Sequence, residues 1–102
     1  MELECGRISR YILPAVRACV AEKMSERYNY NQQEIAIRLG IAQVAVSKYL
    51  NGRYSRSVKV IKDHIERRGL ENNVLRYMNG HDMRKANEAI NDLCADIATK
   101  NW

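Results

Sequence analysis

Apolar residues recur at intervals of three or four along most of the chain, which is the pattern of amphipathic α-helices. The first helix is expected to begin near Pro14, because proline is tolerated where the first N–H of a helix has no partner. Residues 28–31, Tyr-Asn-Tyr-Asn, should end it, and residues 1–10 are expected to form an arm or a short extra turn. The predicted apolar stripe consists of Leu13, Val16, Cys19, Val20 and Met24.

The next segment, residues 31–40, predicts a short helix with a signal at each end. Asn31 can cap its first turn, and Glu34, three residues later, can reach back to complete a capping box. Gly40 follows at the point where a chain leaving a helix often needs a left-handed backbone, which glycine adopts at little cost. The apolar face of this helix consists of Ile35, Ala36 and Leu39.

A second short helix is predicted over residues 43–50. Val46 should face inward, together with Tyr49 or Leu50, and the pair Asn51-Gly52 should close the helix. Two short helices joined by a tight turn form a helix-turn-helix, whose second helix can lie in the major groove of DNA. We therefore expect a DNA-binding motif over residues 31–53.

Residues 57–68 predict a surface helix with one apolar and one charged face. Ser57 is placed to cap its start, and Gly69 should end it. The expected apolar face consists of Val58, Ile61 and Ile65. The expected outer face consists of Lys59, Lys62, Asp63, Glu66 and Arg67.

The chain should finish with a short helix over residues 70–78, closed by Asn79-Gly80, and a longer helix capped by Asp82. The stripe of this last helix consists of Met83, Ala86, Ile90, Leu93, Cys94 and Ile97, with Trp102 just beyond. It either covers the core of its own subunit or pairs with a second copy. Because the core can be complete by about Arg68, we expect a homodimer with an interface within residues 70–102.

These segments predict an all-α fold in one domain, residues 1–102, with about five to six helices and an additional C-terminal amphipathic helix. No apolar run approaches the roughly 18 residues of a membrane span. The stretch 11–21 contains Pro14 and Arg17, so it does not resemble a signal peptide, and we expect a cytoplasmic protein.

The net charge of +5 is concentrated in one region. Residues 1–47 carry net +1 and residues 69–102 carry net −1, whereas residues 48–68 carry seven basic and two acidic side chains, net +5. A solvated helix face more often alternates its signs. A basic cluster beside a helix-turn-helix indicates contacts with the phosphates of a nucleic acid.

Residues 31–53 resemble the helix-turn-helix of lambda-repressor-like (Cro/XRE-type) transcriptional regulators, in register and without a gap. The resemblance covers 23 residues, about a quarter of the chain, and implies a sequence-specific regulator that binds double-stranded DNA. A weaker similarity to small archaeal regulators of this class extends to residues 13–17 and 46–50. The matching positions are Gln32, Glu34, Ala36, Gly40, Gln43, Val46, Asn51 and Gly52.

The resemblance also implies which residues contact DNA: Gln32, Gln33, Ala42, Gln43, Val44, Ser47, Lys48, Asn51, Arg53 and Arg56. Gln32 would hold a phosphate at the start of the first motif helix, where the helix dipole favours an anion. Gln43 would read a base, since its amide matches the N6 and N7 edge of adenine, and Val44 would contact a thymine methyl group. Lys48 would reach either a guanine or a phosphate.

Three residues that follow the recognition helix, Asn51, Arg53 and Arg56, would position the domain by contacting phosphates. Asn51 can instead shape the turn, and Arg53 can instead be solvated. Ala42 departs from the family, because relatives often have Ser or Thr there, a better helix cap by about 1 kcal/mol. The change also removes a hydroxyl group beside the DNA, so base preference should not be transferred from relatives.

Other chemistry has little support in the sequence. Cys5, Cys19 and Cys94 lack C-x-x-C spacing and are expected to be buried thiols, with a redox sensor or a metal site shared across a dimer as the alternative. His64 and His81 have no ligand spacing, and no nucleophile motif or glycine-rich phosphate loop is present, so we expect no metal, no cofactor, no small-molecule ligand and no enzyme. The alternative functions are a protein-interaction module and the DNA-targeting half of an antitoxin.

Overall fold

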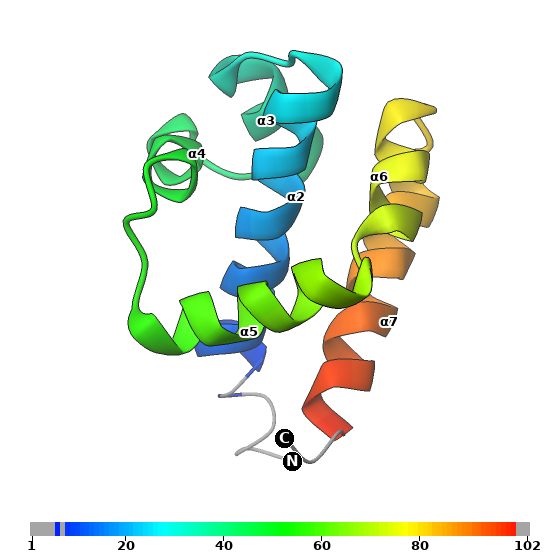
Figure 1. The fold of residues 1–102 in the computed structure, drawn as a ribbon. Helices are drawn as coiled ribbons and strands as arrows, with labels where there is room; N and C mark the ends of the chain where they lie inside the picture. The colour runs from blue at the N-terminus through cyan, green and yellow to red at the C-terminus, as the bar shows by residue number, and fades with distance from the viewer. Residues whose placement is uncertain (1–5, 7, 100–102) are drawn as a thin grey trace.

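The polypeptide folds as the all-α arrangement that its periodicity predicts (Figure 1). The computed structural model describes residue 6 and residues 8–99, and none of these residues forms a strand. In chain order the elements are the π-helix η1 (Ile8–Ile12) and the α-helices α2 (Leu13–Tyr28), α3 (Gln32–Leu39), α4 (Gln43–Leu50), α5 (Arg56–Arg68), α6 (Asn72–Asn79) and α7 (Met83–Thr99). The arm or short turn expected over residues 1–10 overlaps η1, which continues to Ile12. Cys5 and Trp102 lie outside the described residues.

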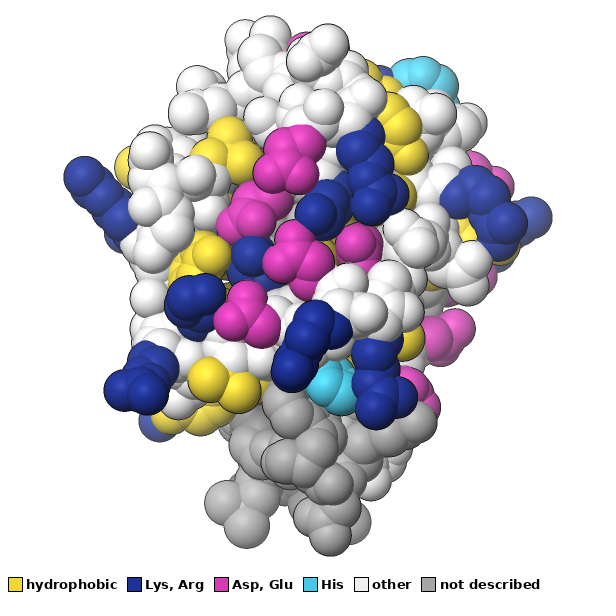
Figure 2. Space-filling model, in the orientation of Figure 1, with side chains coloured by type: hydrophobic (Ala, Val, Ile, Leu, Met, Phe, Trp, Pro, Cys, Tyr) yellow, Lys and Arg dark blue, Asp and Glu magenta, His cyan; other side chains and the backbone are white. Residues whose placement is uncertain are grey.

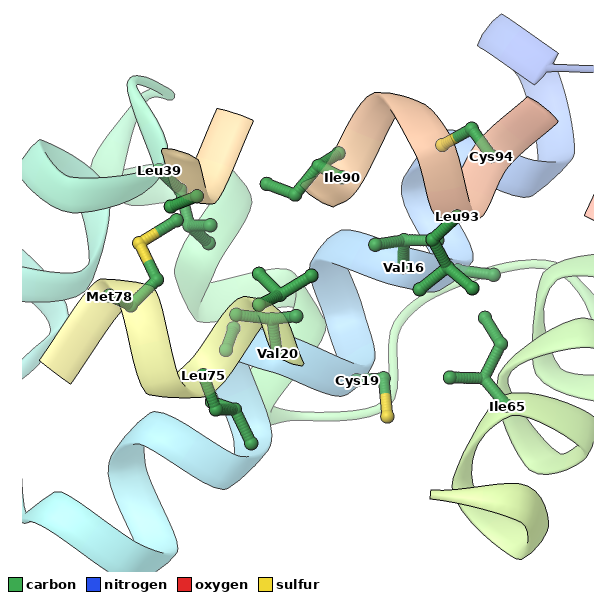
Figure 3. Close-up of a cluster of buried hydrophobic side chains, with 14 of the residues drawn as sticks. Val16, Cys19, Val20, Leu39, Ile65, Leu75, Met78, Ile90, Leu93 and Cys94 are labelled. Atoms are coloured by element: carbon green, nitrogen blue, oxygen red, sulfur yellow. The ribbon is translucent and has the colours of Figure 1, made fainter. Parts of the chain in front are cut away.

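Helix α2 runs through the middle of the molecule, and every other α-helix packs against it. It is buried on most of its circumference because alanines at positions 15, 18 and 21 let neighbouring helices approach from several sides. Figure 3 shows Val16, Cys19 and Val20 surrounded by apolar side chains of the other helices. The predicted stripe is confirmed for four of its members, and Leu13 lies at the edge of the core.

The ends of α3 follow the predicted local signals. The Asn31 side chain accepts a hydrogen bond from the Glu34 amide at 2.8 Å, and the Glu34 carboxylate accepts one from the Asn31 amide at 3.0 Å. This is the reciprocal capping box. Gly40 has φ +67°, which confirms the predicted left-handed exit. Local sequence therefore sets both ends of α3.

The start of α5 differs from the prediction. Ser55, not Ser57, is the cap: its hydroxyl oxygen accepts a hydrogen bond from the Val58 amide at 3.2 Å, and Ser57 lies inside the first turn. Both serines satisfy the local rule. Ser55 follows Tyr54, whose hydroxyl donates a hydrogen bond to Glu22 of α2.

Helices α6 and α7 form a hairpin beside α2. Asp82 caps α7 as predicted, since its carboxylate accepts a hydrogen bond from the Lys85 amide at 3.2 Å. The predicted stripe of α7 is buried within the chain, against α6, α2 and η1, apart from the half-buried Met83. Of the two alternatives for this stripe, the structure therefore shows it covering the core of its own subunit.

Cys94 is 3 % exposed, and burial raises the pKa of its thiol to about 11. We expect the thiol to react slowly with a thiol reagent in the folded protein, as followed by mass spectrometry of the labelled peptide, because only the thiolate is nucleophilic. Cys94→Ala should lower the free energy of unfolding by roughly 1 kcal/mol through lost burial and a small cavity. A variant with Ala95→Cys, at an exposed position of the same helix, should react rapidly. Rapid labelling of Cys94 together with oxidation-dependent DNA affinity would instead indicate a redox sensor.

Candidate nucleic-acid interface

Helix α4 presents a polar surface to solvent. Gln43, Val44 and Lys48 are exposed and Ser47 is half-buried, while Val46 on the opposite side is fully buried between α2 and α3. Val44, 65 % exposed, is an apolar side chain that the fold does not use. This exposed surface therefore combines hydrogen-bonding groups with a small apolar contact, as base edges in a major groove require.

The two ends of α4 are built differently. Ala42 has an extended backbone and supplies no side-chain cap, as its methyl group predicts. At the other end the Asn51 side-chain amide donates a hydrogen bond to the Ser47 carbonyl oxygen at 2.8 Å and contacts the Ser47 hydroxyl at 3.4 Å. Asn51 thus has the turn-shaping role, followed by Gly52 with φ +69°.

Three exposed cations lie next to α4. Lys48 is on the helix, Arg53 follows it, and Arg56 begins α5. Within the described part of the chain none of them forms an ion pair, whereas Lys59, one turn further along α5, contacts Asp63 at 3.2 Å. Unpaired surface cations attract a polyanion most effectively, because no internal carboxylate neutralises them. Lys48, Arg53 and Arg56 are named the basic rim below.

The first helix of the motif carries two glutamines at its start. Gln32 is the first residue of α3 and is half-buried, and Gln33 is exposed. Helices α3 and α4 pack against each other. The sequence prediction did not include Ile37 as a surface residue, yet it is 73 % exposed on α3.

Lys62 does not lie on the outer face of α5, contrary to the prediction. Its side chain is 7 % exposed, and its ammonium nitrogen is 2.9 Å from Glu22 of α2 and 3.6 Å from Glu66. Burial alone would lower the pKa of Lys62, but the hydrogen bond and charge of Glu22 outweigh it and raise the pKa. The net +5 of residues 48–68 thus overstates the charge that is open to a partner.

The carboxylate of Glu22 also accepts a hydrogen bond from the Tyr54 hydroxyl at 3.2 Å. Lys23 extends the network, with its ammonium nitrogen 2.7 Å from Glu66, and its hydrogen bond lowers the pKa of that carboxyl group. Acidic and basic side chains accordingly mix over this face (Figure 2). The network ties the loop between Arg53 and Arg56 to α2. It therefore fixes the position of these two members of the basic rim.

Other kinds of site have no counterpart among the described residues. No three His, Cys, Asp or Glu side chains come together as a metal ion would require. None of the described helices has the length and apolar character needed to cross a membrane. Compared with models of protein families, with curated proteins and with solved structures, the chain matches none of them. The function is therefore argued from the residues and their geometry.

Proposed function

We propose that this protein is a transcriptional regulator that binds double-stranded DNA, with α4 in the major groove. The observation that carries the proposal is the exposed polar surface of α4 beside the unpaired basic rim. The lambda-repressor-like fold and the cytoplasmic location expected from the sequence are part of the same proposal. Gln43 reads an adenine, Val44 contacts a thymine methyl group, and the basic rim contacts phosphates.

A protein-interaction module is the main competing function. The core of a protein–protein interface is usually depleted of charged residues, whereas α4 exposes Lys48 and Gln43 around a single valine. DNA binding also makes a distinctive prediction, because affinity for a polyanion falls steeply with salt. A salt titration therefore separates the two functions.

Replacing Lys48, Arg53 or Arg56 with alanine should weaken specific and non-specific DNA binding alike. Each phosphate contact that is lost should make the slope of log K against log salt shallower by about 0.9. Fluorescence anisotropy with a labelled duplex at several salt concentrations measures the slope. Arg76→Ala is the matched control, since Arg76 is an exposed arginine on α6, remote from α4. Unchanged slopes in all three variants would exclude this surface as the phosphate-binding site.

The homodimer remains a proposal. Its predicted apolar interface is not free, because Ile90, Leu93 and Ile97 are buried within the chain. Exposing that stripe to a partner would require α7 to leave the core, at the cost of its present contacts. A dimer must therefore use a surface other than this stripe.

A further inference from the structure

An open groove of about 470 Å³ runs along the α6–α7 hairpin and is lined by residues of both helices. Its apolar lining consists of the buried Val74 and Leu93 and the half-buried Leu70, Tyr77 and Ala89. Helices α6 and α7 lie on the side of the molecule away from α4 (Figure 1). A partner seated in this groove therefore leaves the proposed DNA surface uncovered.

The charges in this groove come from α7 and are mostly negative. Glu88, Asp92 and Asp96 line it at intervals of one helical turn, and Lys85 is the basic residue among the described lining side chains. The Lys85 ammonium nitrogen lies 5.9 Å from the centre of the Tyr77 ring. Three carboxylates and one ammonium group give the groove a net charge of −2, whereas the whole chain carries +5. The groove is thus a local acidic surface on a basic protein.

The carboxylates of this row differ in how open they are to a partner. Within the described part of the chain, the exposed carboxylate of Asp92 forms neither an ion pair nor a hydrogen bond. Both carboxylate oxygens of Glu88 are 3.3 Å from the guanidinium group of Arg84, which does not line the groove, and both side chains are more than half exposed. An exposed pair of this kind contributes little, so a second cation can share Glu88 at small cost. Asp92, in the middle of the row, offers the strongest attachment point for an external cation.

We propose that this groove binds a basic amphipathic helix of another protein. The helix lies along α7 and covers Leu70, Tyr77 and Ala89 with apolar side chains, as helices that dock in grooves do. A lysine or arginine at every fourth position faces the acidic row, because the row itself repeats at that interval. The small side chain of Ala89 lets the partner helix approach closely. The inference does not rest on the proposed function, because it uses no residue of the DNA surface.

Charge distinguishes this partner from three others. A nucleic acid would bring its phosphates against the acidic row, which repels them. A second copy of the chain, placed groove against groove, would bring two acidic rows together. A helix without cations would cover the Asp92 carboxylate and leave it unpaired, which is costly for a charge removed from water. A partner with cations beside an apolar face satisfies both the charge and the apolar lining of the groove.

A synthetic peptide tests the groove. The probe is a fluorescein-labelled helix of about 18 residues, long enough to be helical, with leucines on one face and lysines on either side of them. It should bind the unmodified chain and shift the amide NMR signals of Tyr77 and Ala89, but not that of Gln43. Its affinity, measured by fluorescence anisotropy, should fall as salt screens the attraction. Because the peptide and the chain are both positively charged, net attraction cannot cause this binding.

Two groove variants and one matched control locate the contact. Asp92→Lys should raise the dissociation constant by more than about tenfold, since a lysine of the peptide then faces a like charge. Glu26→Lys makes the same change of charge at an exposed position of α2 outside the groove, and should hardly alter the affinity. Ala89→Trp fills the groove without changing its charge and should also weaken binding. Lysine is a good helix former, so Asp92→Lys should keep its fold, as checked by circular dichroism.

Three results would overturn the interface: a peptide that does not bind, signal changes confined to another surface, or equal affinities for Asp92→Lys and Glu26→Lys. Signals of Tyr77 and Ala89 that shift with protein concentration when no peptide is present would identify a second copy as the occupant, and would overturn it as well. A chain that binds the peptide in the groove but shows no salt-dependent affinity for DNA would support the interface and overturn the DNA-binding proposal.

Discussion

Gln43→Ala is expected to weaken binding at the cognate DNA site by about 1–3 kcal/mol and to relax discrimination at one base pair per half-site. Non-specific affinity should hardly change, because the exposed amide of Gln43 carries no charge for phosphates. Selection of bound fragments from random DNA, with the unmodified protein and the variant, measures the change in preference. In a dimer the relaxed position should appear twice, about one helical turn apart or a multiple of that.

Gln32→Ala is the matched control, because Gln32 is also a glutamine at the first position of a motif helix. It should weaken all sequences more evenly, since its proposed contact is a phosphate. No hydrogen bond joins the two glutamines among the described residues, so their effects should be close to additive. A selected sequence that is unchanged in Gln43→Ala would show that α4 is not the base-reading helix.

Glu22→Ala should lower the free energy of unfolding by about 3 kcal/mol, the lower end of the range for removing one member of a buried ion pair. The loss leaves the ammonium group of Lys62 buried with only the longer Glu66 contact, and leaves the Tyr54 hydroxyl without its acceptor. Urea denaturation followed by circular dichroism measures the change. The loop between Arg53 and Arg56, which carries Tyr54, should also become less ordered.

Two further variants bracket this effect. Glu26→Ala should change stability by less than about 0.5 kcal/mol, because Glu26 is 64 % exposed and its contact with Lys23 is long, at 3.6 Å. Lys62→Met should cost less than Glu22→Ala, since methionine keeps apolar atoms in the buried space and the partly exposed Glu22 can be hydrated. If Glu22→Ala and Glu26→Ala lowered the free energy of unfolding equally, the buried ion pair would stabilise the protein no more than an exposed one.

Local sequence was sufficient for most element boundaries. The capping box at Asn31, the left-handed Gly40 and Gly69, and the cap at Asp82 were all predicted because each depends on residues within one helical turn. Periodicity likewise identified the buried face of α2 and the stripe of α7. The predicted cap of α5, Ser57, was wrong, because Ser55 two residues earlier satisfies the same local rule.

The sequence pattern could not predict contacts between residues that are far apart in the chain. Lys62 has the spacing of an outer residue, and only the packing of α5 on α2 brings it to Glu22, forty positions earlier in the chain. The stripe of α7 would have suited either its own core or a partner, and tertiary packing assigned it to the core. The candidate DNA surface lies between these cases, because its residues are close in sequence, from Gln32 to Arg56, but belong to three helices.

By itself, then, the sequence determined the all-α class and the limits of the two motif helices. It also determined the outward position of Gln43, Val44 and Lys48. These features could be predicted because hydrogen bonds and burial within one helix are set by near neighbours. Only the tertiary structure decided which charges are open to a partner. An ion pair forms where two helices meet, and the strength of its attraction depends on the water that the fold excludes. Helix crossing buried the ammonium group of Lys62 against Glu22 and left Arg53 and Arg56 exposed.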